Sequence, residues 1–265
     1  MNLLTVAFLA VLSVEAGSEA GPDARPAAPP PGPPPLAQVL SRIDQLNARR
    51  DDKTAYAEEQ SLVVGALARA PRDFGVLWRA ARHYFWSADD PGQPAEQRSR
   101  VGKDCWDLAE RAIAVNPNRV EGHYWAAVCM GNYALGLGIV RALSQGMEGK
   151  FRDRLGRATQ LDGKYQHGGV EIAWGRFFDK LPWPKRDREE AEAHLKRAVE
   201  INPMNLRARV YLASSYLDQD RAADAKRLLD EVATAPAAGR YDPPEERRAK
   251  ALGVGLSQQV VAKLK

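Results

Sequence analysis

The segment covering residues 188–218 constrains the fold of this chain more than any other part of it. Asn202-Pro203 interrupts this segment, because the residue before a proline is pushed out of the α region. Small and apolar residues recur at helical spacing on both sides of the break, with charged residues between them: Ala191, Leu195, Ala198, Val199 and Ile201 before it, and Val210, Leu212, Ala213 and Tyr216 after it. The segment therefore predicts two antiparallel helices joined by a tight turn, with alanines where the helices approach each other.

The same spacing recurs along the chain, which is the signature of an internal repeat. Each of four breaks is preceded, five residues earlier, by an alanine; the breaks are Pro71, Pro117, Gly163 and Pro203, and the alanines are Ala66, Ala112, Ala158 and Ala198. The breaks are 46, 46 and 40 residues apart, longer than the roughly 34 of a tetratricopeptide (TPR) repeat. We therefore expect an all-α fold, a TPR-like α-solenoid of about five helix pairs plus a C-terminal capping helix.

Periodicity and turn signals predict the individual helices. They are expected at approximately 36–49, 54–70, 74–87, 101–115, 119–143, 149–161, 168–180, 187–201, 205–218, 221–234 and 243–264. Residues 87–102 are expected as a long connection. In residues 131–149, Gly136 and Gly138 interrupt an apolar run, and each glycine weakens a helix by about 1 kcal/mol relative to alanine. Close helix packing or room for a ligand would each offset this cost.

The first 35 residues differ in composition from the rest. Residues 3–14 form an apolar run too short to span a bilayer, followed by small residues and a cleavage site at Val14-x-Ala16 or Ser18-x-Ala20. We expect residues 1–20 to be a signal peptide, 21–35 a proline-rich linker and 36–265 the TPR-like repeat domain. This predicts a periplasmic or secreted protein. Because Met1-Asn2 carries no Lys or Arg, a cytosolic protein with an apolar N-terminus stays open as an alternative.

Several motifs occur in an order that resembles a known family. They are LWRAARHYFWSAD (77–89), HYWAAVCMGNYALG (123–136), AWGRFFDKLPW (173–183) and REEAEAHLKRAVEINP (188–203). Together they resemble the periplasmic T-component family associated with TRAP transporters and, more distantly, the regulator-of-microtubule-dynamics TPR family. The resemblance implies a protein that works beside a solute-binding protein. T-components are typically lipoproteins, whereas this chain has no lipobox cysteine, since its first cysteine is Cys105.

Patterns typical of enzymes are absent from the sequence. Gly136-Leu-Gly138 lacks the third glycine of a dinucleotide fingerprint, there is no G-x-S-x-G, and the four histidines have no ligand spacing with Cys, Asp or Glu. We therefore expect no enzymatic activity, no cofactor and no metal site. The pI of about 9.1 permits an anionic partner surface, but a merely solvated basic face explains it more simply. Interspersed acidic residues and the predicted export argue against nucleic acid.

Two function classes remain open. The first is a non-catalytic periplasmic interaction protein, accessory to a TRAP-type solute-binding protein and holding a small apolar or acidic ligand. The second is a general TPR scaffold for cell-envelope protein complexes, with no small-molecule ligand. Both have a protein partner and no transmembrane segment after signal cleavage. Self-association into a homo-oligomer is also open.

The two cysteines stand at equal distances from a predicted turn. Cys105 and Cys129 each lie 12 residues from Pro117, which places them at the same height in an antiparallel helical hairpin. In an oxidising compartment this permits a disulfide, provided that the two side chains also face each other. Two separate buried thiols are the alternative.

The predicted binding surface lies on the first helices of the pairs, which line the concave side of a solenoid. Aromatic walls with a few polar groups are typical of a ligand pocket. The candidate ligand- or partner-binding residues in neighbouring units are Tyr124, Tyr133, Leu137, Arg141, Tyr165, His167, Trp174 and Phe177. Arg141 or His167 would hold an anionic end of the ligand. The alternative is that the aromatic residues only fill the core of the long repeats.

Overall fold

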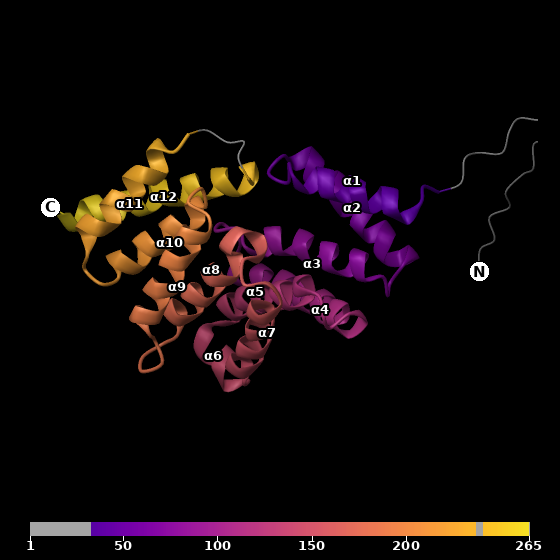
Figure 1. Cartoon of the computed structure of the whole chain (residues 1–265), viewed down its shortest axis with the longest axis horizontal. Coiled ribbons are helices and arrows are strands. Elements are labelled where there is room, and N and C mark those ends of the chain that lie inside the picture. The colour runs from indigo at the N-terminus through magenta and orange to yellow at the C-terminus, as the bar shows by residue number, and fades with distance from the viewer. Residues whose placement is uncertain (1–32, 237–240, 265) are drawn as a thin grey trace, which may run out of the picture. The chain divides into compact units, whose positions relative to one another are not determined.

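The computed structural model describes residues 33–236 and 241–264, and the regular structure in these two ranges is entirely helical (Figure 1). The helices are α1 (Leu36–Asn47), α2 (Lys53–Arg69), α3 (Phe74–Ala88), α4 (Ala95–Val115), α5 (Val120–Leu137), α6 (Ile139–Ser144), α7 (Met147–Asp162), α8 (Tyr165–Lys180), α9 (Arg188–Ile201), α10 (Leu206–Leu217), α11 (Ala222–Thr234) and α12 (Pro243–Leu264). The predicted signal peptide and most of the predicted linker lie outside the described residues.

The helices pack as pairs, in chain order. The pairs are α1 with α2, α3 with α4, α5 with α7, α8 with α9, and α10 with α11, while α12 covers α10 and α11. This confirms the predicted all-α, TPR-like solenoid of five pairs with a C-terminal capping helix. Among the described helices, none combines the length and the apolar composition that a membrane crossing requires.

Short polar side chains begin several of these helices. Asp52, Asp73, Asp187 and Asn205 each accept a hydrogen bond from the backbone amide three residues later. Such N-caps satisfy an amide that has no partner inside the helix, and each typically stabilises by about 1 kcal/mol. The turn chemistry of the sequence therefore sets where these four helices begin.

The alanines that revealed the repeat lie at helix contacts. Ala66, Ala112, Ala158 and Ala198 are all buried. A glycine makes an even closer approach between α8 and α9, where a Cβ built on Gly175 would lie 2.6 Å from Cγ of Leu195. Small residues thus allow the helices of each pair to approach closely, as the periodicity predicted.

Two predicted boundaries were wrong, for backbone reasons. The expected connection at 87–102 becomes helix from Ala95, directly after Pro94, whose fixed φ suits the start of a helix. The predicted helix 119–143 ends at Leu137, because Gly138 adopts a φ of +94°, and the short helix α6 follows. The described residues therefore contain twelve helices where eleven were expected.

The neighbouring Gly136 has a packing role. A Cβ built on it would lie 2.4 Å from the backbone nitrogen of Ser99 and 2.5 Å from the carbonyl oxygen of Ala95. Any side chain there would force α5 away from the N-terminal part of α4. Of the two explanations for this glycine, close helix packing agrees with the structure.

The two cysteines meet across the α4–α5 hairpin. Their Cα atoms are 5.6 Å apart, within the range that a disulfide requires, and the structure joins the two sulfur atoms. Both residues are fully buried.

The first turn of α12 lies against the C-terminal ends of α1 and α3. Arg50 pairs with Asp242 at 2.8 Å, and Arg248 donates a hydrogen bond of 3.0 Å to the carbonyl oxygen of Trp86. Arg247 also pairs with Asp51. The capping helix is therefore tied to the first units of the repeat as well as to the last pair.

Candidate functional site

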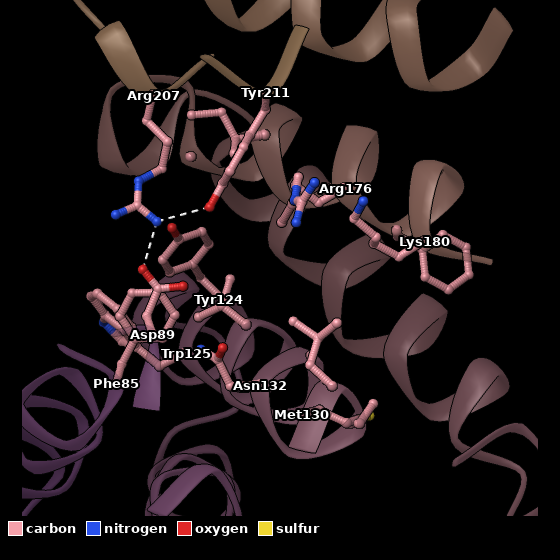
Figure 2. A pocket seen from close by; sticks show the side chains of 18 of the residues that line it. Phe85, Asp89, Tyr124, Trp125, Met130, Asn132, Arg176, Lys180, Arg207 and Tyr211 are labelled. Atoms are coloured by element: carbon pink, nitrogen blue, oxygen red, sulfur yellow. Dashed lines mark hydrogen bonds and ion pairs between the residues drawn. The ribbon is translucent and has the colours of Figure 1, made fainter. Parts of the chain in front are cut away.

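A cavity of about 490 Å³, called the groove below, opens along the first helices of the pairs. Its lining comes mainly from α1, α3, α5, α8, α10 and α12, with further residues from α6 and the start of α7. The first helices of a TPR-like repeat face the same side, so the fold itself assembles this surface from distant parts of the sequence. Figure 2 shows side chains from several of these helices converging on it.

Most of the groove wall is apolar. Apolar residues of α5, α6, α7 and α8 form this wall; they include Val128, Leu135, Leu143, Met147, Phe151, Ile172 and Phe177. Phe177 stacks on Phe151 with ring centroids 4.7 Å apart. The wall therefore offers a large surface to an apolar ligand.

Two cations on α8 border this apolar wall and share one carboxylate. The Oδ2 atom of Asp179 lies 3.3 Å from Nη1 of Arg176 and 2.9 Å from Nζ of Lys180. Arg176 also places its guanidinium 4.1 Å from the ring centroid of Tyr211. Asp179 is buried, whereas Arg176 and Lys180 line the groove on the same side of α8 (Figure 2). Arg176, Lys180 and Asp179 together therefore carry a net charge of about +1 beside the groove.

A second charged cluster of the groove is balanced internally. Nη1 of Arg207 lies 2.5 Å from Oδ2 of Asp89 and donates a hydrogen bond of 3.0 Å to the hydroxyl of Tyr211 (Figure 2), while its Nε pairs with Glu245. Burial opposes the charge on Arg207, but Asp89 and Glu245 outweigh it and raise the pKa of Arg207 well above its usual value. Burial in turn raises the pKa of Glu245. This cluster joins α3, α10 and α12. Because Asp89 and Glu245 already balance the charge of Arg207, the cluster offers little net charge to a ligand.

Tyr124 occupies the part of the groove next to this cluster. Its ring packs edge-on against Trp125 at 5.0 Å and Tyr165 at 5.2 Å between centroids. Burial raises the pKa of Tyr124, so its hydroxyl keeps its proton. A Cβ built on Gly169 would lie 2.7 Å from that hydroxyl oxygen, so the glycine makes room for the ring. Tyr124 is therefore a neutral group held in one position.

Of the eight candidate residues named from the sequence, the structure brings two to the groove. Tyr124 and Phe177 line it. Tyr165 packs behind Tyr124, and His167 lies outside the lining, edge-on to Tyr241 at 4.7 Å. The groove is lined by the row of helices named from the sequence, but which side chains of each helix face it depends on how the helix is rotated about its axis.

The other four candidates lie outside the groove lining. Tyr133 packs against Trp106 of α4 at 6.0 Å, and Leu137 packs against the core. Arg141 is exposed on α6 outside the groove lining. Trp174 donates a hydrogen bond of 3.0 Å to Thr159 of α7 and stacks on His194 of α9 at 5.9 Å. Tyr133, Leu137 and Trp174 thus belong to helix contacts, which was the alternative for the aromatic residues.

Arg176 and Lys180 were not among the binding residues predicted from the sequence. Their spacing of four residues puts them on one face of a helix, and Phe177 lies on the same side of it. That signal was present in the motif AWGRFFDKLPW. By contrast, Arg207 and Asp89 are 118 residues apart, and no local pattern joins them.

Two family models and one crystal structure of a TPR protein agree with this architecture. The family described as regulator of microtubule dynamics protein 1-3 matches residues 39–167, and a tetratricopeptide-repeat family matches residues 185–242. The crystal structure of TTC0263, a thermophilic TPR protein from Thermus thermophilus, has 18% identity and a TM-score of 0.62, covering 86% of this chain and all of that one. A crystal structure of MamA protein has 12% identity and a TM-score of 0.45, covering 77% of this chain and 99% of that one.

No curated protein matches the chain in a comparison of sequences. At 18% identity the likeness to TTC0263 shows the fold alone. Within the described residues, no three His, Cys, Asp or Glu side chains gather as a metal site would require. The two matched segments and the repeat geometry together support a TPR-like helical-repeat protein, an architecture typical of interaction scaffolds.

Proposed function

We propose that this chain is a non-catalytic binding protein of the cell envelope, accessory to a TRAP-type solute-binding protein. In this proposal the groove holds a small molecule with an apolar body and an acidic group. The observation that carries it is the pair Arg176 and Lys180, which share the single carboxylate of Asp179 beside an apolar cavity.

The size of the groove supports a small ligand. A volume of about 490 Å³ falls within the roughly 300–1,000 Å³ of ligand pockets, which are mostly apolar with a few polar groups that fix orientation. Burying the apolar part of such a ligand contributes about 25 cal/mol per Å² of surface removed from water. Affinity would therefore come mainly from the wall formed by α5, α6, α7 and α8.

The unmatched charge supports an acidic group on that ligand. A carboxylate or sulfonate placed between Arg176 and Lys180 would balance the second cation, with charge-assisted hydrogen bonds worth about 1.5–3 kcal/mol each. The Arg207 cluster is already paired, so it fits a structural role better than a role in holding the ligand.

The accessory role rests on different support. The sequence resembles TRAP T-components, and the predicted signal peptide would place the chain beside periplasmic solute-binding proteins. The TPR-like fold is typical of proteins that bind other proteins. A general envelope scaffold without a ligand is the competing function.

Native mass spectrometry of the full chain isolated from its own cell envelope tests the proposal. A bound acidic molecule of a few hundred daltons, lost on collisional activation, is expected, together with a co-purifying solute-binding protein. Isolation of ligand-free protein bound only to envelope assembly proteins would favour the scaffold and contradict the proposal.

A further inference from the structure

In the described part of the chain, three buried asparagine side chains line the groove, and one of them lacks a hydrogen-bond partner. Asn47 donates a hydrogen bond of 3.1 Å to Oε1 of Glu59. Asn205 donates one of 3.1 Å to the carbonyl oxygen of His167 and accepts another from a backbone amide at the start of α10. Asn132 of α5 is only 4% exposed, yet its side chain forms no hydrogen bond with any residue that the structure describes.

Asn132 stands at a position where the pattern of α5 favours an apolar residue. Val128 lies four residues before it and Leu135 three residues after it, so the three side chains share one side of the helix. All three line the groove, and Figure 2 shows the side chain of Asn132 among those that converge there. The amide therefore interrupts an otherwise apolar stripe of the wall.

A buried amide without a hydrogen bond destabilises a folded protein. Most buried polar side-chain atoms have a partner, because removing such an atom from water without replacing its hydrogen bonds costs free energy. A ligand group that completes the hydrogen bonds of Asn132 would recover this cost on binding. The two bonded asparagines of the groove have nothing comparable to gain from a ligand.

Close packing of α4 on α5 fixes the backbone at this position. A Cβ built on Gly102 would lie 2.6 Å from the backbone nitrogen of Tyr133 and 3.1 Å from the carbonyl carbon of Asn132. Gly136 approaches the backbone of Ser99 as closely, one turn later on α5. Helix α5 therefore has little freedom to shift here, and the amide of Asn132 is held in place before a ligand binds.

We propose that Asn132 is a specificity-determining residue of the groove and binds an uncharged oxygen, a hydroxyl or a carbonyl, on the apolar body of the ligand. This inference rests on the proposed function and narrows the ligand to an oxygenated apolar acid. An asparagine amide has two N–H donors and one acceptor oxygen and carries no charge, so it suits a neutral oxygen, while Arg176 and Lys180 hold the acidic end. A few such polar groups in an apolar wall fix the orientation of a ligand and give a pocket its specificity.

Calorimetric titration of the full chain tests this, with dodecanoate compared against 3-, 6-, 9- and 12-hydroxydodecanoate, which place a hydroxyl at different distances from the acidic end. At least one hydroxylated acid should bind the wild type about threefold to tenfold more tightly than dodecanoate, as expected for one neutral hydrogen bond. In Asn132→Leu the order should reverse, because a hydroxyl buried against leucine has no partner.

The titration separates failure of this inference from failure of the proposed function. Dodecanoate binding with no gain from any hydroxyl, or a gain that persists in Asn132→Leu, would overturn the inference and leave the proposed function standing. Absence of binding by dodecanoate and by every hydroxylated acid would contradict the proposed function, and the inference with it.

Thermal unfolding without ligand gives an independent test. Asn132→Leu should raise the melting temperature by about 2–4 °C, because it removes a buried amide that has no partner and adds apolar surface to the wall. Asn205→Leu is the matched control, since it removes a similarly buried asparagine whose amide both donates and accepts a hydrogen bond, and it should lower the melting temperature by about 2–4 °C or more. A lower melting temperature for Asn132→Leu would overturn the inference, because the amide would then stabilise the fold, for example by holding a water molecule.

Discussion

Arg207 of α10 and Asp89 at the end of α3 form a buried ion pair across 118 residues of sequence, with 2.5 Å between Nη1 and Oδ2. The side chain of Arg207 is only 9% exposed, and Glu245 of α12 pairs with it from another direction. The pair therefore links the second unit of the repeat to the last pair and to the capping helix.

Replacing Arg207 by Met should destabilise the protein strongly. The substitution keeps much of the side-chain volume but removes the cation closest to the partly buried Asp89 and Glu245. Arg248 and Arg50 stay 3.7 Å from these carboxylates, so the loss should approach but not exceed the roughly 3–5 kcal/mol typical of a broken buried ion pair. Denaturant unfolding measures the loss. Lys226→Met, on the exposed side of α11, should change the free energy of unfolding by less than about 0.5 kcal/mol. Equal stabilities for the two variants would show that the cluster contributes nothing.

Two glycine-to-alanine substitutions should change the free energy of unfolding in opposite directions. Gly175→Ala puts a methyl group 2.6 Å from Cγ of Leu195 and 3.1 Å from the carbonyl oxygen of Ala191, and it should cost about 1–3 kcal/mol. Gly156→Ala in α7 meets nothing within 4 Å and should stabilise by about 0.5–1 kcal/mol through helix propensity. Thermal unfolding of both variants checks this. A stabilised Gly175→Ala would contradict the close packing of α8 on α9.

The repeat was predictable because its signals are local. Alanines five residues before each break and the Asn-Pro turns lie within one helix length of each other, so the sequence displays them directly. The Arg207–Asp89 pair could not be predicted in this way, since only the stacking of units brings the residues together. Residues 87–102 were predicted as a connection because their composition is typical of a loop. In the structure, helix α4 begins within this segment at Ala95, directly after Pro94.

The groove was predictable at the level of helices and not of side chains. The rule that first helices line the binding face placed α5 and α8 correctly. An error of one residue on a helix rotates a side chain by about 100°, which separates Trp174, packed on His194, from Ala173, which lines the groove. Without the packing partners of α8, the sequence alone did not determine this rotation.

The cysteine pair should be oxidised in protein taken from an oxidising compartment. Closing the loop between Cys105 and Cys129 is expected to stabilise by about 3 kcal/mol through lost entropy of the unfolded chain. Labelling of unfolded, unreduced protein with a thiol reagent should detect no free thiol. Two labelled thiols per chain would contradict the bond, and the Cys105→Ala/Cys129→Ala variant measures its contribution to stability.

Stability should fall as the pH drops below about 6.5 because of His123. Burial lowers the pKa of this histidine from its usual value of 6.5, and the nearby Arg154 and Arg157 lower it further. In the window between the two pKa values the unfolded state binds a proton that the folded state excludes. The stabilising effect is therefore complete above pH 6.5 and is lost as the pH falls through the lower folded-state value.

His123→Gln isolates this effect, because the amide can keep the hydrogen bond of 2.8 Å that Nε2 makes with the carbonyl oxygen of Pro117. Urea unfolding at several pH values should show a smaller loss for the variant than for the wild type below pH 6.5. Parallel pH profiles for both proteins would contradict the assignment.

We propose that the groove binds an apolar molecule through an acidic end held by Arg176 and Lys180. Calorimetric titration of the full chain with dodecanoate tests it most directly, with 1-dodecanol as the uncharged probe of equal length. Dodecanoate should bind more tightly than dodecanol, and Lys180→Gln should weaken dodecanoate binding about tenfold. Lys226→Gln should leave it unchanged. Absence of dodecanoate binding, or equal affinity of both probes for wild type and Lys180→Gln, would contradict the claim.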